Sequence, residues 1–420
     1  MNKTLEFNIK QISLCVFLVP ALLLCTPNFS VAVIIFCVLS SLYCLIKNRQ
    51  GYLKLNSFDW LCLFILSTYL ISNIPVAIVD WGNFRYFKGG ARLLLCIPIY
   101  LMLINILNMD RINCIFKHLT FGVIFGSIAT LGVALYQYII LNEVRVGGFL
   151  YSINFGYLSC SLAFLALCLM KSEQSKSWLF FSFISASIAT ILTLTRGAIF
   201  AIPLLLMLIC VVRYKQLSMK KVVSLLSLLA IVGLGLYYSS TDIQRRVAEN
   251  AKEFAHLESG QIAKAPSAGG RIELWKTAYQ AFVRSPIIGM TFSQRVNLNQ
   301  ELYREHETTH WVTTVERAHA HSQYFEMLAS TGILGVISFV TILFLPIFMF
   351  FHHYKKTNSL VGYVGGIFVA GFAIFGLTEV LLTANLIGAF YGFFLAIFLA
   401  IMRVEKYGQN EEKIEGTLVQ

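Results

Sequence analysis

Residues 360–402 have the sequence LVGYVGGIFVAGFAIFGLTEVLLTANLIGAFYGFFLAIFLAIM, and this run is almost entirely apolar. Its single charged side chain is Glu379. A helix needs roughly 20 apolar residues to cross a hydrocarbon core about 30 Å thick. The stretch is long enough for two such helices, and a short turn near Glu379 divides it. We therefore predict membrane-spanning helices near residues 360–380 and 384–402.

The rest of the chain has a similar character. Of its 420 residues 57% are hydrophobic and only 13% are charged, whereas a soluble domain has about 25% charged residues. This composition excludes a soluble enzyme, a disordered protein and a fibrous protein. We predict an all-α polytopic membrane protein with about twelve transmembrane helices. The other ten spans are expected near residues 11–26, 31–46, 60–79, 91–108, 118–141, 149–170, 178–194, 197–212, 222–238 and 324–351.

The basic residues predict the orientation of the chain. More than half of the 33 basic residues lie at the termini or in alternate linkers, and such linkers usually face the cytoplasm. We therefore predict spans one to nine in residues 1–238, a periplasmic loop in 239–322, spans ten to twelve in 323–402 and a cytoplasmic tail in 403–420. The basic residues in question are Lys3, Lys10, Lys47, Arg49, Lys54, Arg111, Lys117, Lys171, Lys176, Arg213, Lys215, Lys220, Lys221, Lys355, Lys356, Arg403, Lys406 and Lys413.

The net charge of +12 is explained by this orientation, so nucleic-acid binding is not expected. The ten cysteines all lie in the first half, mostly inside apolar runs, which favours packing over disulfides or zinc–thiolate sites. Five basic residues stand in short external segments with few acids nearby. They indicate either an anionic ligand or snorkelling to lipid phosphates. These residues are Arg85, Lys88, Arg92, Arg145 and Arg196.

The predicted periplasmic loop contains the chemically interesting residues. Helix-like apolar spacing predicts helices over residues 242–258 and 271–284. Arg271 opens the second helix, and His319 and His321 directly precede the tenth span. A neutral imidazole can accept a proton near neutral pH. Arginines on the same side of the membrane, such as Arg271, can bind phosphate oxygens without a metal.

Three motifs resemble the signature of the O-antigen ligase and polymerase superfamily, which also includes protein O-oligosaccharyltransferases. They are Thr195-Arg196-Gly197, Gly270-Arg271-x-x-x-Trp275, and His321-Ser322 followed by Leu328, Gly332 and Gly335. A weaker external motif, Arg145-Val146-Gly147-Gly148 with Asn154 and Gly156, is also similar. The residue after the motif histidine is often Asn, whereas here it is Ser322. The resemblance covers most of the chain.

The resemblance implies a membrane-glycosyltransferase-like fold and a function in the inner membrane of a Gram-negative bacterium. It implies transfer of O-antigen from undecaprenyl diphosphate to lipid A–core. In this scheme His321 deprotonates the acceptor hydroxyl, and Arg196 and Arg271 hold the leaving diphosphate. Arg145, Lys88, Arg92 and Arg85 are further substrate-binding candidates.

We expect neither a metal nor another cofactor, since the chain has no Asp-x-Asp motif and arginines can replace the metal. His319 is also a substrate-binding candidate. In a helix its ring would point about 200° away from that of His321, so we expect the two rings to face different directions.

Other functions are also open at this point. Within the family, an O-antigen polymerase uses a second lipid-linked glycan as acceptor. A protein O-oligosaccharyltransferase fits less well. Such chains often carry more external C-terminal sequence, whereas this chain is expected to end in the cytoplasm. His306-Glu307-Thr308-Thr309-His310 matches the zinc metalloprotease pattern. However, Thr308, Thr309 and residues 311–314 favour strand or loop over helix. A transporter would need polar residues inside its spans, and these spans are nearly free of charge.

Overall fold

The structure is a computed structural model, and it describes residues 2–47, 54–172, 175–216, 219–239, 241–261, 265 and 267–418. Over these residues the regular structure is helical, and they contain no strand. The predicted all-α fold class is therefore confirmed.

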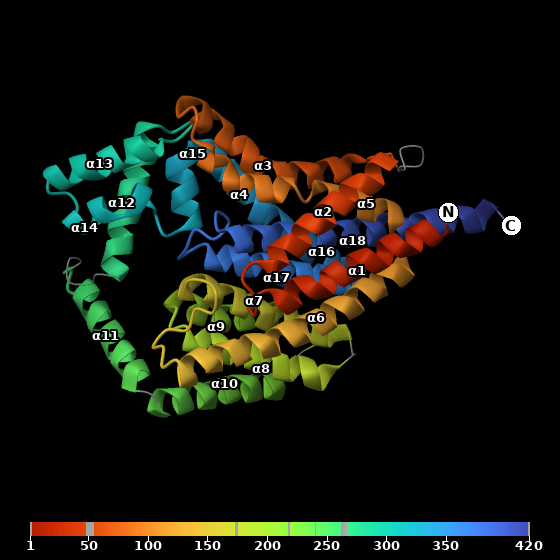
Figure 1. Cartoon of the computed structure of the whole chain (residues 1–420), viewed down its shortest axis with the longest axis horizontal. Helices are drawn as coiled ribbons and strands as arrows, with labels where there is room; N and C mark the ends of the chain where they lie inside the picture. Colours follow the sequence, from red (N-terminus) through yellow and green to blue (C-terminus); the bar gives the residue numbers. More distant parts are fainter. Residues whose placement is uncertain are drawn as a thin grey trace.

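Most of the helices lie side by side in one bundle (Figure 1). Both termini lie at one end of this bundle, and α11–α14 lie at the other end. The bundle contains α1 (Asn2–Leu22), α2 (Phe29–Lys47), α3 (Ser57–Val79), α4 (Phe87–Leu94), α5 (Ile97–Ile106), α6 (Met109–Leu135), α7 (Ser152–Leu169), α8 (Lys176–Leu192), α9 (Arg196–Val212), α10 (Met219–Ser239), α15 (Gln323–Phe339), α16 (Leu345–Thr357), α17 (Leu360–Phe375) and α18 (Asn385–Leu418).

Each of the twelve predicted spans coincides with a helix or with two consecutive helices. In the described residues, seven helical stretches are long and apolar enough to cross a membrane, and α8, α9 and α17 are shorter apolar helices. The span predicted over 91–108 consists of α4 and α5, with Pro98 in the first turn of α5. The protein is therefore a polytopic membrane protein. The predicted tail, as far as Leu418, continues α18.

The core of the bundle is built around α18. Of the residues in its apolar stretch 94% are buried, and it packs against α2, α4, α5 and α17. Phe390, Phe394 and Phe398 interact with Phe368 of α17. A helix that is apolar on every side is expected at the centre of a bundle. This position carries the preceding loop, residues 376–384, to the end of the bundle opposite the termini.

Helix α15 is broken at Gly332, which has φ +59° and ψ −140°. A side chain is strained at this positive φ, and a Cβ here would lie 2.5 Å from the carbonyl oxygen of Pro286. Instead, the amide of Ile333 donates to that oxygen at 2.8 Å. Because of this break, the first part of the predicted tenth span is a separate helical segment, residues 323–331, and α15 packs against α12 and α3.

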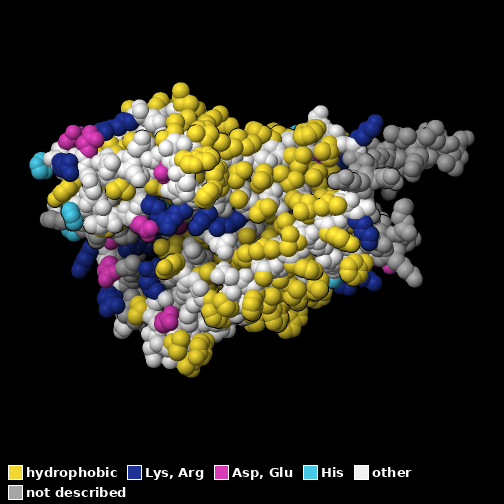
Figure 2. Space-filling view, turned by 45° about the horizontal axis from the view of Figure 1, so that its top comes forward, with side chains coloured by type: hydrophobic (Ala, Val, Ile, Leu, Met, Phe, Trp, Pro, Cys, Tyr) yellow, Lys and Arg dark blue, Asp and Glu magenta, His cyan; other side chains and the backbone are white. Residues whose placement is uncertain are grey.

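In its described residues, the segment between α10 and α15 contains four helices and a short 3₁₀ turn. They are α11 (Thr241–Glu258), α12 (Ala268–Arg284), α13 (Phe292–Arg304), α14 (His310–Thr314) and η6 (Glu316–Ala318). The helices predicted over 242–258 and 271–284 are confirmed. Figure 2 shows hydrophobic side chains over the middle of one face, with charged side chains gathered toward both ends. This distribution fits a bundle that crosses a bilayer.

Candidate active site

His319 and His321 lie on a short non-helical segment between η6 and α15. His319 has extended backbone angles, and His321 has φ +48°. Their rings are 4.5 Å apart between centroids and both face Glu379. The expectation that the two rings face different directions is therefore wrong. It assumed a helical phase, whereas this segment is not a helix.

Glu379 lies in the loop between α17 and α18 and is the hydrogen-bond partner of His321. Its Oε2 is 3.1 Å from Nδ1 of His321, and its Oε1 is 3.6 Å from Nε2 of His319. A carboxylate can only accept a hydrogen bond, so Nδ1 of His321 carries the proton. This tautomer leaves Nε2 of His321 as the atom that can accept a proton from a substrate.

The charge states in this cluster follow from burial and from mutual contact. Burial opposes ionisation of Glu379, but the hydrogen bond from His321 and the charges of both histidines hold its pKa below the usual value. Burial lowers the pKa of His319, and the attraction of Glu326 and Glu379 offsets this effect only in part. At neutral pH the cluster therefore contains a carboxylate and a neutral His319.

A buried ion pair holds the histidine segment in place. Arg295 of α13 is 2% exposed and contacts Glu326 of α15, with Nη1 2.5 Å from Oε1. Arg295 also donates to the carbonyl of Ala318, and the amide of Ala320 donates to Glu326 at 2.8 Å. The sequence pattern did not predict this pair. Arg295 lies three and seven residues before the buried Leu298 and Leu302, so it occupies a position on the apolar face of α13. An arginine at such a position is the feature of the sequence that could have indicated the pair.

The loop that carries Glu379 is anchored to the start of α9. The hydroxyl of Tyr157 lies 2.6 Å from that of Thr378, the residue before Glu379. A Cβ at Gly197 would lie 2.1 Å from the Tyr157 hydroxyl and 2.3 Å from that of Thr378. Only glycine allows this approach. The Thr195-Arg196-Gly197 motif is therefore packed directly against the loop that holds the histidine partner.

Arg196 has free donors beside this contact. Its Nη1 lies 2.6 Å from Oε2 of Glu253 on α11. Its Nε and Nη2 are buried and have no hydrogen-bond partner in the described part of the chain. Arg271, half-buried at the start of α12, is close enough to Tyr157 to interact electrostatically with its hydroxyl. Arg196 thus directly precedes Gly197, which packs against the Tyr157–Thr378 contact, and Arg271 lies near the hydroxyl of Tyr157.

Glu253 links Arg196 to the start of α12. Burial opposes ionisation of Glu253, but Arg196 and the backbone amides of Ala268 and Ser267 hold its pKa below the usual value. The carboxylate therefore stays charged at neutral pH. It fixes Nη1 of Arg196 and leaves the other two donors to bind an anion.

The other four basic candidates differ in whether they contact the loops that form the site. Nε of Arg145, an exposed residue, donates to the carbonyl of Thr193 at 3.3 Å, just before Arg196. Arg92 donates to the carbonyl of Thr383 at 2.7 Å, on the loop that follows Glu379. Lys88 and Arg85 are exposed near the start of α4, and no contact among the described residues joins them to the histidines. The structure thus brings Arg145 and Arg92 to the two loops of the site, but not the other two.

The zinc protease motif does not form a site. His306 has φ +59° and lies in a turn, whereas α14 begins at His310, so the two histidines do not share one helix face. Glu307 instead pairs with Lys276, with Oε2 3.1 Å from Nζ. The expectation of strand or loop holds for Thr308 and Thr309. It is wrong for residues 311–314, because these residues form most of α14. A single helical turn packed against α12 and α13 overrides the weak local preference of threonine and valine.

Among the described residues, the three potential metal ligands that lie together are His319, His321 and Glu379, with ligand atoms within 4.8 Å of one another. Two imidazoles and one carboxylate are a set that zinc can use. The same contacts also suit a general base, His321, whose ring is held by the carboxylate of Glu379.

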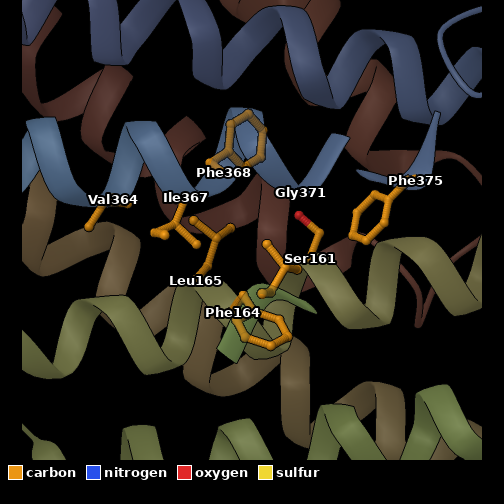
Figure 3. A pocket seen from close by; sticks show the side chains of 9 residues that line it. Ser161, Phe164, Leu165, Val364, Ile367, Phe368, Gly371 and Phe375 are labelled. Atoms are coloured by element: carbon orange, nitrogen blue, oxygen red, sulfur yellow. The ribbon is translucent and has the colours of Figure 1, made fainter. Parts of the chain in front are cut away.

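A small cavity inside the bundle does not suit a substrate. Figure 3 shows it between α7 and α17, with Phe164 and Leu165 on one side and Phe368 on the other. Its volume is about 10 Å³, roughly what one water molecule needs. The lining is apolar except for Ser161. This cavity is a gap in helix packing.

These observations describe a class of protein, namely a polytopic helical membrane protein with a histidine–glutamate pair and two arginines at one end of its bundle. Comparison with known proteins agrees with this class. A family model described as O-antigen ligase matches residues 180–340, which include Arg196, Arg271 and His321. The resemblance predicted from the motifs, to the O-antigen ligase superfamily, is therefore confirmed.

Two relatives are similar to the chain at low identity. An uncharacterized protein of Haemophilus influenzae is 24% identical over 368 residues, which are 85% of this chain and 88% of that protein. The O-antigen ligase of Escherichia coli K12 is 24% identical over 194 residues, which are 46% of this chain and 44% of that protein. At a coarse level, these similarities support a membrane ligase of the glycosyltransferase type that acts on lipid-linked glycans and lipid acceptors.

Proposed function

We propose that the protein is an O-antigen ligase of the Gram-negative inner membrane. It transfers a glycan from undecaprenyl diphosphate to lipid A–core at the periplasmic surface. The observation that carries this proposal is the pair His321–Glu379, packed through Thr378 against the start of α9, where Arg196 retains two free buried donors. A proton acceptor and a phosphate clamp at one end of the bundle are what such a transfer needs.

In the proposed reaction, Nε2 of His321 takes the proton of an acceptor sugar hydroxyl. The hydroxyl oxygen forms a bond to the anomeric carbon of the donor glycan, and the bond from that carbon to the diphosphate oxygen breaks. Undecaprenyl diphosphate leaves with the electron pair, and the anomeric centre is inverted. Glu379 stabilises the imidazolium that forms, and it holds the ring in one tautomer.

The arginines supply positive charge where the leaving group gains negative charge. Arg196 offers Nε and Nη2, and Arg271 adds a second guanidinium on the same side. Planar guanidinium groups bind phosphate oxygens through paired hydrogen bonds. The reaction therefore needs no metal ion in this scheme.

The test of the proposal is the lipopolysaccharide of a deletion strain. Loss of a ligase leaves lipid A–core without O-antigen and accumulates lipid-linked polymer. Core capped by a single repeat would instead assign the chain as an O-antigen polymerase. A normal banding pattern would overturn both assignments.

Purified protein provides a second test, which separates the base from a metal site. We expect transfer to continue in EDTA and in the Glu307→Gln variant. Loss of transfer on chelation, restored by zinc, would instead assign His319, His321 and Glu379 as metal ligands.

A further inference from the structure

A cleft of about 530 Å³ lies beside the active site at the same end of the bundle. Its polar lining comes from three asparagines: Asn28 in the α1–α2 turn, Asn154 in the first turn of α7, and Asn385 at the start of α18. Phe149 and Tyr151, in the segment before α7, line it as well. We call it the asparagine cleft. Its volume falls within the range of about 300–1,000 Å³ typical of ligand pockets.

Two short connections join the asparagine cleft to the active site. Asn154 and Tyr157 are three residues apart on α7, so they lie on one face of that helix, and Tyr157 contacts Thr378. On the other side, Asn385 ends the loop that carries Glu379. Arg92 holds this end of the loop, because its Nε donates to Oδ1 of Asn385 at 3.0 Å. The Nδ2 group of Asn385 is then oriented as a donor.

The lining of the cleft has the chemistry of a sugar site. It contains no charged side chain, so it does not match a diphosphate, and three amides make it too polar for a polyprenyl chain. Each asparagine can both donate and accept hydrogen bonds, as sugar hydroxyls require. Phe149 and Tyr151 are 56% and 84% exposed, so their rings can pack against the C–H face of a sugar.

The position of the cleft distinguishes the acceptor from the donor. Arg196 and Arg271 come from α9 and α12, whereas the asparagine cleft is formed by the α1–α2 turn and the starts of α7 and α18. In an inverting displacement the acceptor oxygen approaches opposite to the leaving group. Arg196 and Arg271 are not among the residues that line the cleft, so a sugar bound there would leave both guanidinium groups to the diphosphate.

We propose that the asparagine cleft binds the terminal sugar of the glycolipid acceptor. This inference rests on the proposed ligase function. The cleft lies at helix ends, where the sugars of a lipid-anchored molecule stand just outside the hydrocarbon core. Asn154 and Asn385 recognise the hydroxyls, and Tyr151 packs against the ring.

The test is transfer by purified protein, with lipid A–core from a ligation-deficient strain as acceptor and undecaprenyl-diphosphate-linked glycan as donor. We expect Asn154→Leu, Asn385→Leu and Tyr151→Ala to raise the KM for lipid A–core at least about tenfold. The KM for the donor should stay within about twofold of the wild type. Asn297→Leu, on the exposed face of α13, is the matched control and should change neither KM.

The outcomes separate the two proposals. If the wild-type protein transfers no glycan, the ligase function fails, and the acceptor site fails with it. If the wild type is active but the variants keep the wild-type KM for lipid A–core, the acceptor site alone is wrong. A rise in the donor KM instead would assign the cleft to the donor glycan. Because Tyr151 is 84% exposed, its replacement tests the site without disturbing the core.

Discussion

At the scale of single residues, the decisive feature is that two histidines share one carboxylate. The motif position singled out His321, and in the structure its Nδ1 lies 3.1 Å from Oε2 of Glu379. The sequence did not indicate that His319 lies beside it. Glu379 itself stood out only as a charge in an apolar stretch. Its role depends on a contact across 58 residues, which no local pattern encodes.

The first prediction separates the two histidines. His321→Ala should lower the turnover of glycan transfer by about 10²–10⁴-fold, the usual contribution of a general base, while donor binding persists. His319→Ala should have a smaller effect, because its Nε2 is 3.6 Å from Glu379. Transfer assays with donor binding measured separately check this. A dead His319→Ala beside an active His321→Ala would reverse the assignment.

The second prediction concerns the charge of Glu379. Glu379→Gln should reduce turnover at least tenfold, because the amide cannot stabilise the imidazolium; a similar change in a Ser–His–Asp triad costs ~10⁴. Folding lowers the pKa of Glu379 from its ordinary value of 4.5. Its contribution to stability is therefore present above that value and lost as the pH falls through the lower folded pKa.

Thermal unfolding between pH 3 and pH 7 measures how the contribution of Glu379 to stability depends on pH. The stability difference between wild type and Glu379→Gln should shrink as the pH falls below 4.5 toward pH 3. Glu301→Gln is the control, because Glu301 pairs with Arg284 on the exposed surface of α13. A difference that grows as the pH falls below 4.5 would contradict a charged Glu379 in the folded protein.

The third prediction concerns the phosphate clamp. Arg196→Lys and Arg271→Lys should each abolish most transfer and weaken donor binding, because an ammonium cannot make paired hydrogen bonds to phosphate. For Arg196 the lost groups are the free donors Nε and Nη2. Measured donor affinity checks this. Lysine variants with wild-type affinity would show that charge alone is enough.

At the scale of elements, hydropathy located the helices but not their breaks. A membrane requires helices, so apolar runs predict them well. The break of α15 at Gly332 depends on a contact with Pro286 in another segment, and the buried Arg295–Glu326 pair joins α13 to α15. Such contacts between elements position the histidine segment, and the sequence alone did not predict them.

The fourth prediction tests the Arg295–Glu326 pair. Arg295→Met should destabilise the protein by roughly 3–5 kcal/mol, because it leaves a buried carboxylate unpaired. Arg295→Met combined with Glu326→Leu should recover much of this stability but not transfer, since the double variant lacks the acceptor for the Ala320 amide. Thermal unfolding and transfer assays check both. Full activity of the double variant would mean that the pair does not position the histidines.

At the scale of the whole molecule, both termini lie at one end and α11–α14 at the other (Figure 1). The sequence predicted this arrangement from an even number of spans and a long polar loop. It also predicted Arg196, Arg271 and His321 on one side, and they do lie at one end of the bundle. Which side of the membrane this end faces follows from the positive-inside rule alone, so it stays a prediction with its own test.

The fifth prediction is that orientation. A cysteine placed at Ser267, next to α12, should react with a membrane-impermeant maleimide added to intact spheroplasts. Lys356→Cys, at the opposite end of the bundle, should react only after the membrane is opened. Cys25 lies half-buried near the α1–α2 turn, so both variants are made in a Cys25→Ser background to remove its signal. The reverse pattern would place the histidines in the cytoplasm, where they could not reach a periplasmic donor, and the ligase assignment would fail with the topology.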